Sequence, residues 1–319
     1  MTRKNAIEAT GLRKTYGDRV AVDALDLNVE TGTVLGFLGP NGAGKTTVIR
    51  MLSTVLRPDQ GHFVVAGVPD TRPADIRRCI GVLPEGAGYP PAQTAEEWLS
   101  YHGRLFGASR RVAGDDARRL LSEVGLAERA DSRIASLSRG LRQRLGIARA
   151  MINNPEVVFL DEPTLGLDPT GQRQVLGLVA RIARDHGVTV VLSTHTLTEV
   201  EQICHRVVIL NRGRVVADGT VGEIVKLAAA PRRGVLQVPV DLRQRAVDAL
   251  AAQGIEASVT QDRQDEVELV LPADMPPDQA SAAALRCLLD DGVPVLGLTL
   301  EGGRLNDAFL AVTEGASDE

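Results

Sequence analysis

The residues best suited to chemistry form one glycine-rich stretch, Gly39–Thr47, which fits the pattern G-x-x-x-x-G-K-[ST]. Glycines let the backbone turn tightly and point several N–H groups at an anionic phosphate. Lys45 can reach the β- and γ-phosphates of a nucleotide, and the Thr46 hydroxyl can ligate Mg²⁺. The stretch therefore predicts a nucleotide site. Its residues are Gly39, Pro40, Asn41, Gly42, Ala43, Gly44, Lys45, Thr46 and Thr47.

The segments on either side of this stretch predict the elements that hold it. Thr33–Leu38 reads as a buried strand, and the residues after the stretch predict a helix with one apolar face. That face comprises Val48, Leu52, Val55 and Leu56. The helix N-terminus would point at the loop and favour a bound anion. Lys45 is one of only four lysines in a chain that otherwise carries its positive charge as arginine.

Two adjacent carboxylates follow a second apolar run. Val157–Leu160 reads as a parallel strand buried on both faces, and Asp161 and Glu162 emerge at its carboxyl end, where ligands bind in such sheets. Asp161 suits a Mg²⁺ ligand, and Glu162 suits a base or an orienter for an attacking water. His195 follows the next predicted strand, Val188–Ser193, and is a candidate contact for the γ-phosphate.

Three further segments could contribute to the same site. Ile80–Glu85 predicts a strand that ends in a carboxylate, and Tyr16 lies ahead of the phosphate loop among short β-like runs of residues 6–38. An aromatic ring there either stacks on a purine or packs ordinarily, and position alone does not decide between the two. Ser138 is a plausible N-cap for a helix with an apolar stripe. The stripe comprises Leu141, Leu145, Ala148 and Ile152. The arginines predict a solvated face and are Arg142, Arg144 and Arg149.

The remaining helices are predicted from their start and stop signals. Two helices are expected over Glu96–Phe106 and Ala113–Val124, and another begins at the N-cap Asp168 and stops at Gly187. Three aromatic residues in this region indicate either core packing or a surface for a partner. They are Trp98, Tyr101 and Phe106.

Composition limits the class of protein. The 319 residues are 44% hydrophobic and 24% charged, typical of a globular protein with one large or two ordinary domains. A formal net charge of −5 argues against a mainly nucleic-acid-binding surface, so we expect no direct nucleic-acid partner. The scattered Cys79, Cys204 and Cys287 predict buried thiols in a reducing compartment, rather than disulfides or zinc. With no secretory signal and no run of about 20 apolar residues, a membrane role would need a partner.

The pattern changes near residue 222, after which no phosphate chemistry is visible. Segments of strand and helix type alternate as βαββαβ, which predicts a small ferredoxin-like α+β domain over residues 222–319. Residues 228–234 would form its linker, and a final helix would run from Arg304 to about Val312.

These motifs, in this order, resemble the nucleotide-binding subunit of an ABC transporter over roughly residues 5–220. The resemblance implies an α/β P-loop NTPase cassette over residues 1–221. Such a cassette has a parallel-sheet core, an antiparallel β subdomain and a helical subdomain, here at about 92–152. It implies ATP and Mg²⁺ as cofactors, with Tyr16 stacking on adenine. The implied catalytic residues are Glu162, His195, Glu85 and Lys45. The implied Mg²⁺ contacts are Thr46, Asp161 and Glu85. The residues implied to reach ATP in trans are Ser138, Arg139, Gly140 and Asp168.

Two positions depart from the pattern of that family. The family signature is usually LSGGQ, whereas this chain has Arg139 and Leu141 in place of glycine and glutamine. Ser138 and Gly140 still offer a hydroxyl and a backbone N–H at the start of a helix. Glu85 stands where the family's Q-loop has glutamine, and a carboxylate oxygen can still approach Mg²⁺ or its water.

With these two departures and the stretch Asn306–Thr313 near its C-terminus, the chain resembles ATPases of type-2 bacterial exporters. Among these, it is most similar to the daunorubicin-resistance group. That resemblance implies a homodimer sandwiching two ATP molecules and driving a separate membrane permease for drug, antibiotic or lipid-like cargo. It places the chain peripherally at the cytoplasmic face of the cell membrane. The region from Glu85 to about Phe106 would receive the permease, and residues 222–319 would steady the dimer or modulate its closure.

Two alternative functions follow from the same nucleotide site. A soluble ABC-type ATPase could act on nucleic acid or ribosomes, but too few residues separate Lys45 from Ser138 for the long coiled coils of repair ATPases. Ribosome-associated members have two cassettes, and only one G-x-x-x-x-G-K occurs here. A regulator could bind nucleotide without turnover, but Glu162 and His195 are both present.

Overall fold

The computed structural model describes residues 5–86, 88–227, 233–259, 265–272, 275, 277–301, 305–306 and 308–309. The chain divides into two compact units, Met1–Val221 and Gly222–Glu319, each of which has a hydrophobic core. All the residues predicted to form the nucleotide site belong to the first unit.

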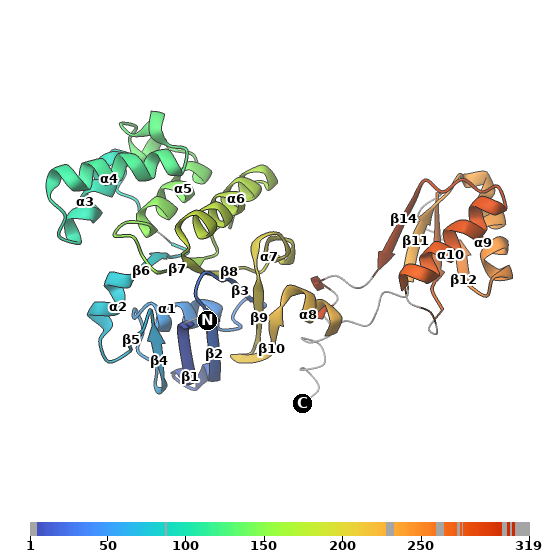
Figure 1. The fold of residues 1–319 in the computed structure, drawn as a ribbon, viewed down its shortest axis with the longest axis horizontal. Helices are drawn as coiled ribbons and strands as arrows, with labels where there is room; N and C mark the ends of the chain where they lie inside the picture. Colours follow the sequence, from blue (N-terminus) through green and yellow to red (C-terminus); the bar gives the residue numbers. More distant parts are fainter. Residues whose placement is uncertain are drawn as a thin grey trace. The chain divides into compact units, whose positions relative to one another are not determined.

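A six-stranded sheet forms the centre of the first unit, with the order β10-β9-β3-β8-β7-β6 (Figure 1). Its strands are β3 (Val34–Leu38), β6 (Ile80–Leu83), β7 (Val157–Asp161), β8 (Thr189–Ser193), β9 (Arg206–Asn211) and β10 (Arg214–Thr220). Neighbours from β9 to β6 pair in parallel, and β10 closes an antiparallel hairpin with β9. Every residue of β3, β7 and β8 is buried, as expected for parallel strands covered on both faces. The carboxyl ends of these three strands therefore share one edge of the sheet.

A second, antiparallel sheet has the order β2-β1-β4-β5. Its strands are β1 (Asn5–Tyr16), β2 (Arg19–Glu30), β4 (Gln60–Val65) and β5 (Val68–Pro69). The short runs predicted over residues 6–38 are longer in the structure, because register shifts let the β1–β2 pairing continue past Gly11, whose φ is +61°. One core joins Ile7 of this sheet, Phe37 of the central sheet and Val48 of α1 (Lys45–Leu52).

Helix α1 is shorter than its apolar pattern predicts. Val48 and Leu52 are buried and Leu56 packs partly on the same core, but Val55 is 72% exposed. The helix ends after Leu52, and Thr54 adopts a left-handed φ of +62°, which turns the chain before Val55 can continue the apolar face. The assignment of Val55 to that face was therefore wrong.

Helices α3 (Ala95–Leu105), α4 (Arg110–Glu123) and α5 (Arg139–Ala150) gather away from β1, β2 and β4 (Figure 1). Thr94 and Glu97 form a capping box at the start of α3, which satisfies backbone N–H groups that the helix leaves free. Single 3₁₀ turns at Ala127–Arg129 and Ile134–Ser136 connect α4 to α5. The other helices in the described residues of this unit are α2 (Pro73–Cys79), α6 (Pro169–His186) and α7 (Leu197–Ile203), and α8 (Val221–Leu227) begins at its last residue.

Aromatic rings and one arginine join α3 and α5 to β6. Trp98 is buried, and its ring centroid lies 5.2 Å from that of Tyr89 and 4.8 Å from that of His102. The guanidinium of Arg149 lies 5.6 Å from the Trp98 centroid and donates to the Val82 carbonyl at 2.6 Å. The predicted solvated face was therefore wrong for Arg149, because a cation–π contact and a backbone acceptor hold its side chain inward.

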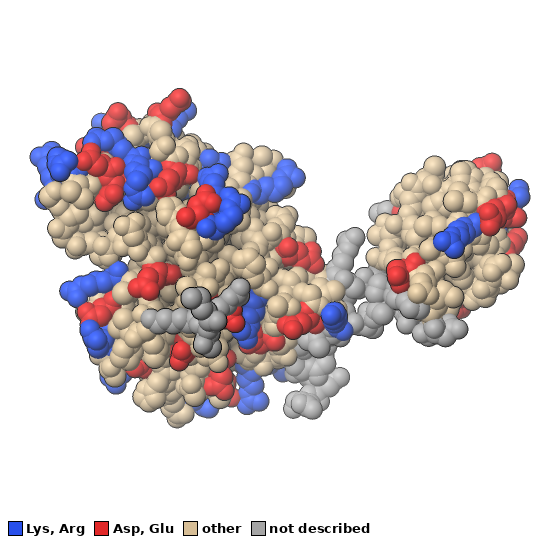
Figure 2. Space-filling model, viewed as in Figure 1, with Lys and Arg blue, Asp and Glu red and all other residues tan. Residues whose placement is uncertain are grey.

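The outer surface of α3 and α4 carries charges of both signs. Arg118 pairs with Glu96 at 2.9 Å and Arg119 pairs with Glu123 at 2.7 Å. Figure 2 shows blue and red side chains mixed over these helices. The visible face of the helical part therefore has no single-sign field among its described residues.

In its described residues, the second unit contains a four-stranded antiparallel sheet, two helices that follow strands of this sheet, and most of α8. Its strands have the order β12-β13-β11-β14 and every neighbouring pair is antiparallel. They are β11 (Arg233–Gln237), β12 (Glu256–Val259), β13 (Glu266–Val270) and β14 (Gly297–Glu301). A 3₁₀ turn at Val240–Leu242 leads into α9 (Arg243–Ala252), and α10 (Pro277–Asp290) connects β13 to β14. The chain order βαββαβ with this strand order is the ferredoxin-like arrangement. Most of the linker and final helix predicted at 228–234 and 304–312 lies outside the described residues.

None of the helices in the described parts of the chain has the length and apolar character needed to cross a bilayer. Cys204 is buried as predicted, whereas Cys79 and Cys287 are only half-buried. Cys204 lies beneath the central sheet against Gly36, while Cys79 ends α2 and Cys287 faces the Ala249 carbonyl from α10. The prediction of full burial was therefore wrong for two of the three thiols.

Candidate nucleotide site

The phosphate loop connects β3 to α1. Gly44 has φ +110°, and a Cβ at this position would lie 2.5 Å from the Ala21 carbonyl oxygen, so a side chain would not fit. The Lys45 ammonium donates to the carbonyl oxygens of Gly39 at 2.7 Å and Pro40 at 3.2 Å, which folds the loop around it. Burial lowers the pKa of Lys45, and the carboxylates of Glu162 and Asp161 oppose this shift. The loop thus has a desolvated cation at its centre.

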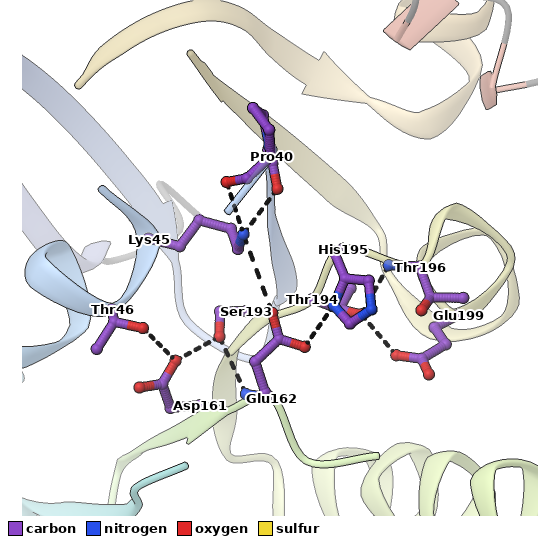
Figure 3. Close-up of polar contacts among 11 residues, drawn as sticks. Pro40, Lys45, Thr46, Asp161, Glu162, Ser193, Thr194, His195, Thr196 and Glu199 are labelled. Carbon is purple, nitrogen blue, oxygen red and sulfur yellow. Dashed lines mark hydrogen bonds and ion pairs between the residues drawn. The ribbon is translucent and has the colours of Figure 1, made fainter. Parts of the chain in front are cut away.

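Asp161 receives two hydroxyl groups at the end of β7 (Figure 3). Thr46 donates to Asp161 Oδ1 at 3.0 Å from the first turn of α1, and Ser193 donates to the same oxygen at 2.6 Å from the end of β8. The three residues come from separate elements whose ends meet at the sheet edge. A hydroxyl and a carboxylate oxygen are hard ligands that suit Mg²⁺.

Glu162 is held in an unusual backbone conformation beside Asp161. Its φ is +49°, and its N–H donates to both the carbonyl and the hydroxyl oxygen of Ser193, at 3.2 and 3.0 Å. The side chain then extends toward Lys45, whose Nζ lies 3.9 Å from Oε1, and toward His195, whose Nδ1 lies 3.0 Å from Oε2 (Figure 3). Burial raises the pKa of Glu162, while His195 and Lys45 lower it. This carboxylate is therefore a stronger base than an exposed one.

A buried network supports the segment that carries His195. Thr194 is fully buried, and its hydroxyl donates to Glu199 Oε2 at 2.7 Å and accepts from Thr196 N–H at 3.0 Å. Glu199, on α7, is itself only 3% exposed. The network fixes the backbone on both sides of His195 and leaves its ring free to face Glu162.

One cavity of about 640 Å³ contains most of the predicted cis residues. It is lined by loop residues, by Glu162 and His195, and by Tyr16 and Glu85. Tyr16 is 48% exposed at the cavity, so its ring does not pack into the core. Glu85 is exposed at the cavity rim, two residues beyond the end of β6. The volume lies within the range of small-ligand sites, roughly 300–1,000 Å³.

Arg19 also lines this cavity, and we did not identify it from the sequence. Its Nη2 donates to the carbonyl oxygen of Gly42 at 3.1 Å, and Arg19 pairs with Tyr16 across the β1–β2 turn. The sequence signal that could have identified Arg19 is its position three residues after Tyr16. Ser193, Thr194 and Glu199 were missed too, because a hydroxyl or a carboxylate has no recognisable partner until the fold brings one close.

The signature residues lie elsewhere in the chain, in a second cavity of about 390 Å³. Ser138 caps α5 as predicted and accepts from Leu141 N–H at 3.4 Å. Asp168 caps α6 by accepting from Gly171 N–H at 3.0 Å. Among the described residues none lines both cavities, so within one chain the predicted in-trans set lines a different cavity from the phosphate loop. Those residues are Ser138, Arg139, Gly140 and Asp168.

The donor set fits MgATP better than a protein-caged metal. Among the described residues, no group of three or more His, Cys, Asp or Glu side chains could hold a metal ion. Mg²⁺ is commonly held by one or two carboxylates together with substrate phosphates and water, which the pair Thr46 and Asp161 beside the phosphate loop would allow.

This fold and site define a class of protein. The family described as ABC transporter matches residues 22–165. Among solved structures, the ATP-binding cassette MJ0796 in a dimer bound to ADP and Pi is similar with a TM-score of 0.62 and 26% identity, covering 67% of this chain and 98% of that one. Part of the cbiONQ ABC transporter complex, cbiO1 from Clostridium perfringens, has a TM-score of 0.65 and 25% identity, covering 70% and 91%.

Sequence relatives extend the similarity to almost the whole chain. The daunorubicin/doxorubicin resistance ATP-binding protein DrrA of Streptomyces peucetius is 39% identical, covering 98% of this chain and 94% of its own length. The Nod factor export ATP-binding protein I of Paraburkholderia xenovorans (strain LB400) is 39% identical, covering 69% and 72%. The chain therefore belongs to the ABC transporter family, as an ATP-binding ATPase subunit. The predicted family, fold class and ATPase activity are confirmed.

Proposed function

We propose that the chain is the ATP-hydrolysing subunit of an exporter for drug, antibiotic or lipid-like cargo. The observation that carries this proposal is that Thr46, Glu162 and His195 line one cavity, with Asp161 accepting a hydrogen bond from Thr46. This arrangement provides a metal site and a base, which is more than binding alone needs. The names of the relatives, which include drug-resistance and Nod factor export proteins, support export as the purpose of hydrolysis.

In the proposed reaction, Glu162 accepts a proton from the attacking water, and its raised pKa suits that role. Lys45 leaves its carbonyl contacts to neutralise the β- and γ-phosphates, and His195 orients Glu162 and approaches the γ-phosphate. Tyr16 stacks on adenine at the exposed end of the cavity.

We assign Mg²⁺ to Thr46 and Asp161, with Glu85 approaching the ion or its water from the cavity rim. Mg²⁺ would supply charge neutralisation on the β- and γ-oxygens during transfer. The hydroxyl of Thr46 already donates to Asp161, so both ligands are held close before an ion arrives.

Two copies of the chain would complete each site. The cavity at the phosphate loop and the cavity at the signature have no lining residue in common in the part of the chain that the structure describes, which leaves Ser138, Arg139, Gly140 and Asp168 available to a nucleotide held by a second copy. The dimeric structure of the similar cassette MJ0796 supports this arrangement. We therefore propose a head-to-tail homodimer around two ATP molecules.

Closure of the ATP-bound dimer would drive a conformational change in a separate membrane permease. The end of α3 has exposed apolar residues suited to a protein partner: Tyr101 is 51%, Leu105 64% and Phe106 46% exposed. We propose that the permease contacts this surface together with the segment after Glu85, at the cytoplasmic face of the membrane. The unit over 222–319 would steady the dimer or modulate its closure.

The test is affinity purification of the tagged Glu162→Gln protein from detergent-solubilised native membranes with MgATP. This substitution removes the base and should all but abolish turnover, so that the ATP-bound complex persists. A multi-spanning membrane protein at near 1:1 stoichiometry is the expected result, and its recovery should fall in a parallel Lys45→Ala sample because nucleotide binding is weakened. Recovery from the soluble fraction alone, with ribosomes or nucleic acid, would refute the exporter proposal.

A further inference from the structure

The arginine of the signature turn has a side chain without an ionic partner. Arg139 is the first residue of α5 and is exposed, and among the described residues its side chain makes no hydrogen bond or ion pair. A cation at a helix N-terminus is electrostatically unfavourable, because the helix dipole is positive at that end. Helix propensity and local charge therefore do not explain why this guanidinium is held in place.

Packing explains its position. The guanidinium of Arg139 lies against Gly166, so that a Cβ built on Gly166 would lie 2.6 Å from Nη1 and 2.7 Å from Nη2. Both nitrogens are almost equally close to this point, so the guanidinium covers the space that a side chain at 166 would occupy. Gly166 has φ +71°, a conformation in which glycine is favoured for its own sake as well. The contact is possible only because position 166 has no side chain.

Gly166 lies in the segment that connects the two cavities. The segment starts at Glu162, and its turns are closed by hydrogen bonds from Leu165 N–H to the Glu162 carbonyl and from Leu167 N–H to the Thr164 carbonyl, at 3.2 and 3.1 Å. Leu165 lines the nucleotide cavity, whereas Gly166 and the residues up to Asp168 line the signature cavity. A shift of this segment would therefore move both Glu162 and the residues that line the signature cavity.

We propose that Arg139 is a positioning residue, which holds the segment between Glu162 and Asp168 by packing its guanidinium on Gly166. The signature turn and the segment that follows the base then move together. This inference rests on the proposed role of Glu162 in hydrolysis. It also links two sequence features that are otherwise unrelated, because an arginine at 139 requires a glycine at 166.

A methyl group at position 166 tests this pairing, at the conformational cost that φ +71° imposes on any side chain. The atoms that it would meet are the far end of a flexible side chain, so Gly166→Ala displaces the guanidinium instead of the backbone. Arg139→Ala removes the same contact from the other side. If the contact positions the segment, either substitution alone and both together should cause the same loss, because each removes one shared interaction.

The experiment compares kcat and KM for ATP hydrolysis in four full-length proteins: wild type, Gly166→Ala, Arg139→Ala and the double variant. Coupling between contacting residues predicts that Gly166→Ala lowers kcat about tenfold when Arg139 is intact, but less than about threefold when it is added to Arg139→Ala. Arg139→Lys should behave like Arg139→Ala, because an ammonium keeps the charge but lacks the flat face that covers Gly166.

Gly187→Ala is the matched control. Gly187 has a similar φ of +63°, and a Cβ there would meet no described atom within 4 Å beyond its own local backbone, so it measures the conformational cost alone. We expect Gly166→Ala and Gly187→Ala to lower the melting temperature similarly and only Gly166→Ala to lower kcat. Losses that multiply to about a hundredfold in the double variant would overturn the inference, since the two positions would then act independently. A wild-type chain without ATP hydrolysis would instead refute the proposed function.

Discussion

The bridge made by the Ser193 hydroxyl predicts a measurable loss of stability. In Ser193→Ala, Asp161 loses the donor at 2.6 Å, while Thr46 still donates to it at 3.0 Å. The Glu162 N–H loses the hydroxyl but keeps the Ser193 carbonyl at 3.2 Å, so no backbone donor is left unsatisfied. The expected cost is therefore that of one hydrogen bond to a buried charge.

Hydrogen bonds to charged groups contribute about 1.5–3 kcal/mol, so we expect Ser193→Ala to lower the free energy of unfolding by about 2 kcal/mol. For a unit of 221 residues, this corresponds to a fall of roughly 4–8 °C in melting temperature. Differential scanning calorimetry of the intact, nucleotide-free chain can measure the shift.

Ser53→Ala supplies the matched control. Ser53 is buried to a similar degree, at 2% exposed, but its hydroxyl makes one long bond of 3.4 Å to the neutral carbonyl of Arg50. This substitution should cost at most about 1 kcal/mol. Equal shifts for the two variants would refute the reasoning, because the carboxylate would then add nothing to the strength of the bond.

Three further predictions concern the nucleotide cavity. His195→Ala should move the acid limb of the kcat–pH profile to higher pH. Only ionised Glu162 can accept a proton, and His195 lowers the pKa of Glu162. The profile of the control His62→Ala, which alters a residue outside the cavity, should not move. Arg19 lines the cavity beside Gly42, and we predict that its guanidinium also contacts ATP, so Arg19→Gln should raise the KM for ATP by roughly tenfold with kcat little changed. Arg214→Gln, which alters an exposed arginine paired with Asp23, should leave KM unchanged, and equal effects of the two would argue against a contact from Arg19. Glu85→Gln should keep turnover within about threefold of wild type, and complete loss would show that the carboxylate itself is needed.

The sequence predicts most of the nucleotide cavity because parallel strands impose strict geometry. Asp161 is the last residue of β7 and His195 follows the neighbouring strand β8, so their proximity follows from the rule that ligand residues emerge at carboxyl ends. Helix caps at Ser138 and Asp168 were predictable for a similar reason, since each depends on a donor only three residues away.

Features that depend on a single backbone turn or on distant contacts were not predictable. The apolar pattern continues to Val55, but a left-handed turn at Thr54 ends the helix, and pattern alone carries no information about that turn. Arg149 has the spacing of an exposed helical residue, yet the ring of Trp98 and a carbonyl of β6 hold it inward. The role of Gly166 could not be inferred either, because its neighbour in space is 27 positions away at Arg139.

The packing around Trp98 has an optical consequence. The chain contains a single tryptophan, so tryptophan fluorescence reports on the environment of Trp98, where α3 and α5 pack near β6. Arg149 on α5 is also bonded to the Val82 carbonyl of β6 at 2.6 Å, so a rotation of the helices that breaks this bond would free the guanidinium to move against the indole and change the emission. The protein therefore carries a built-in, label-free probe of motion between its helical part and its nucleotide-binding sheet.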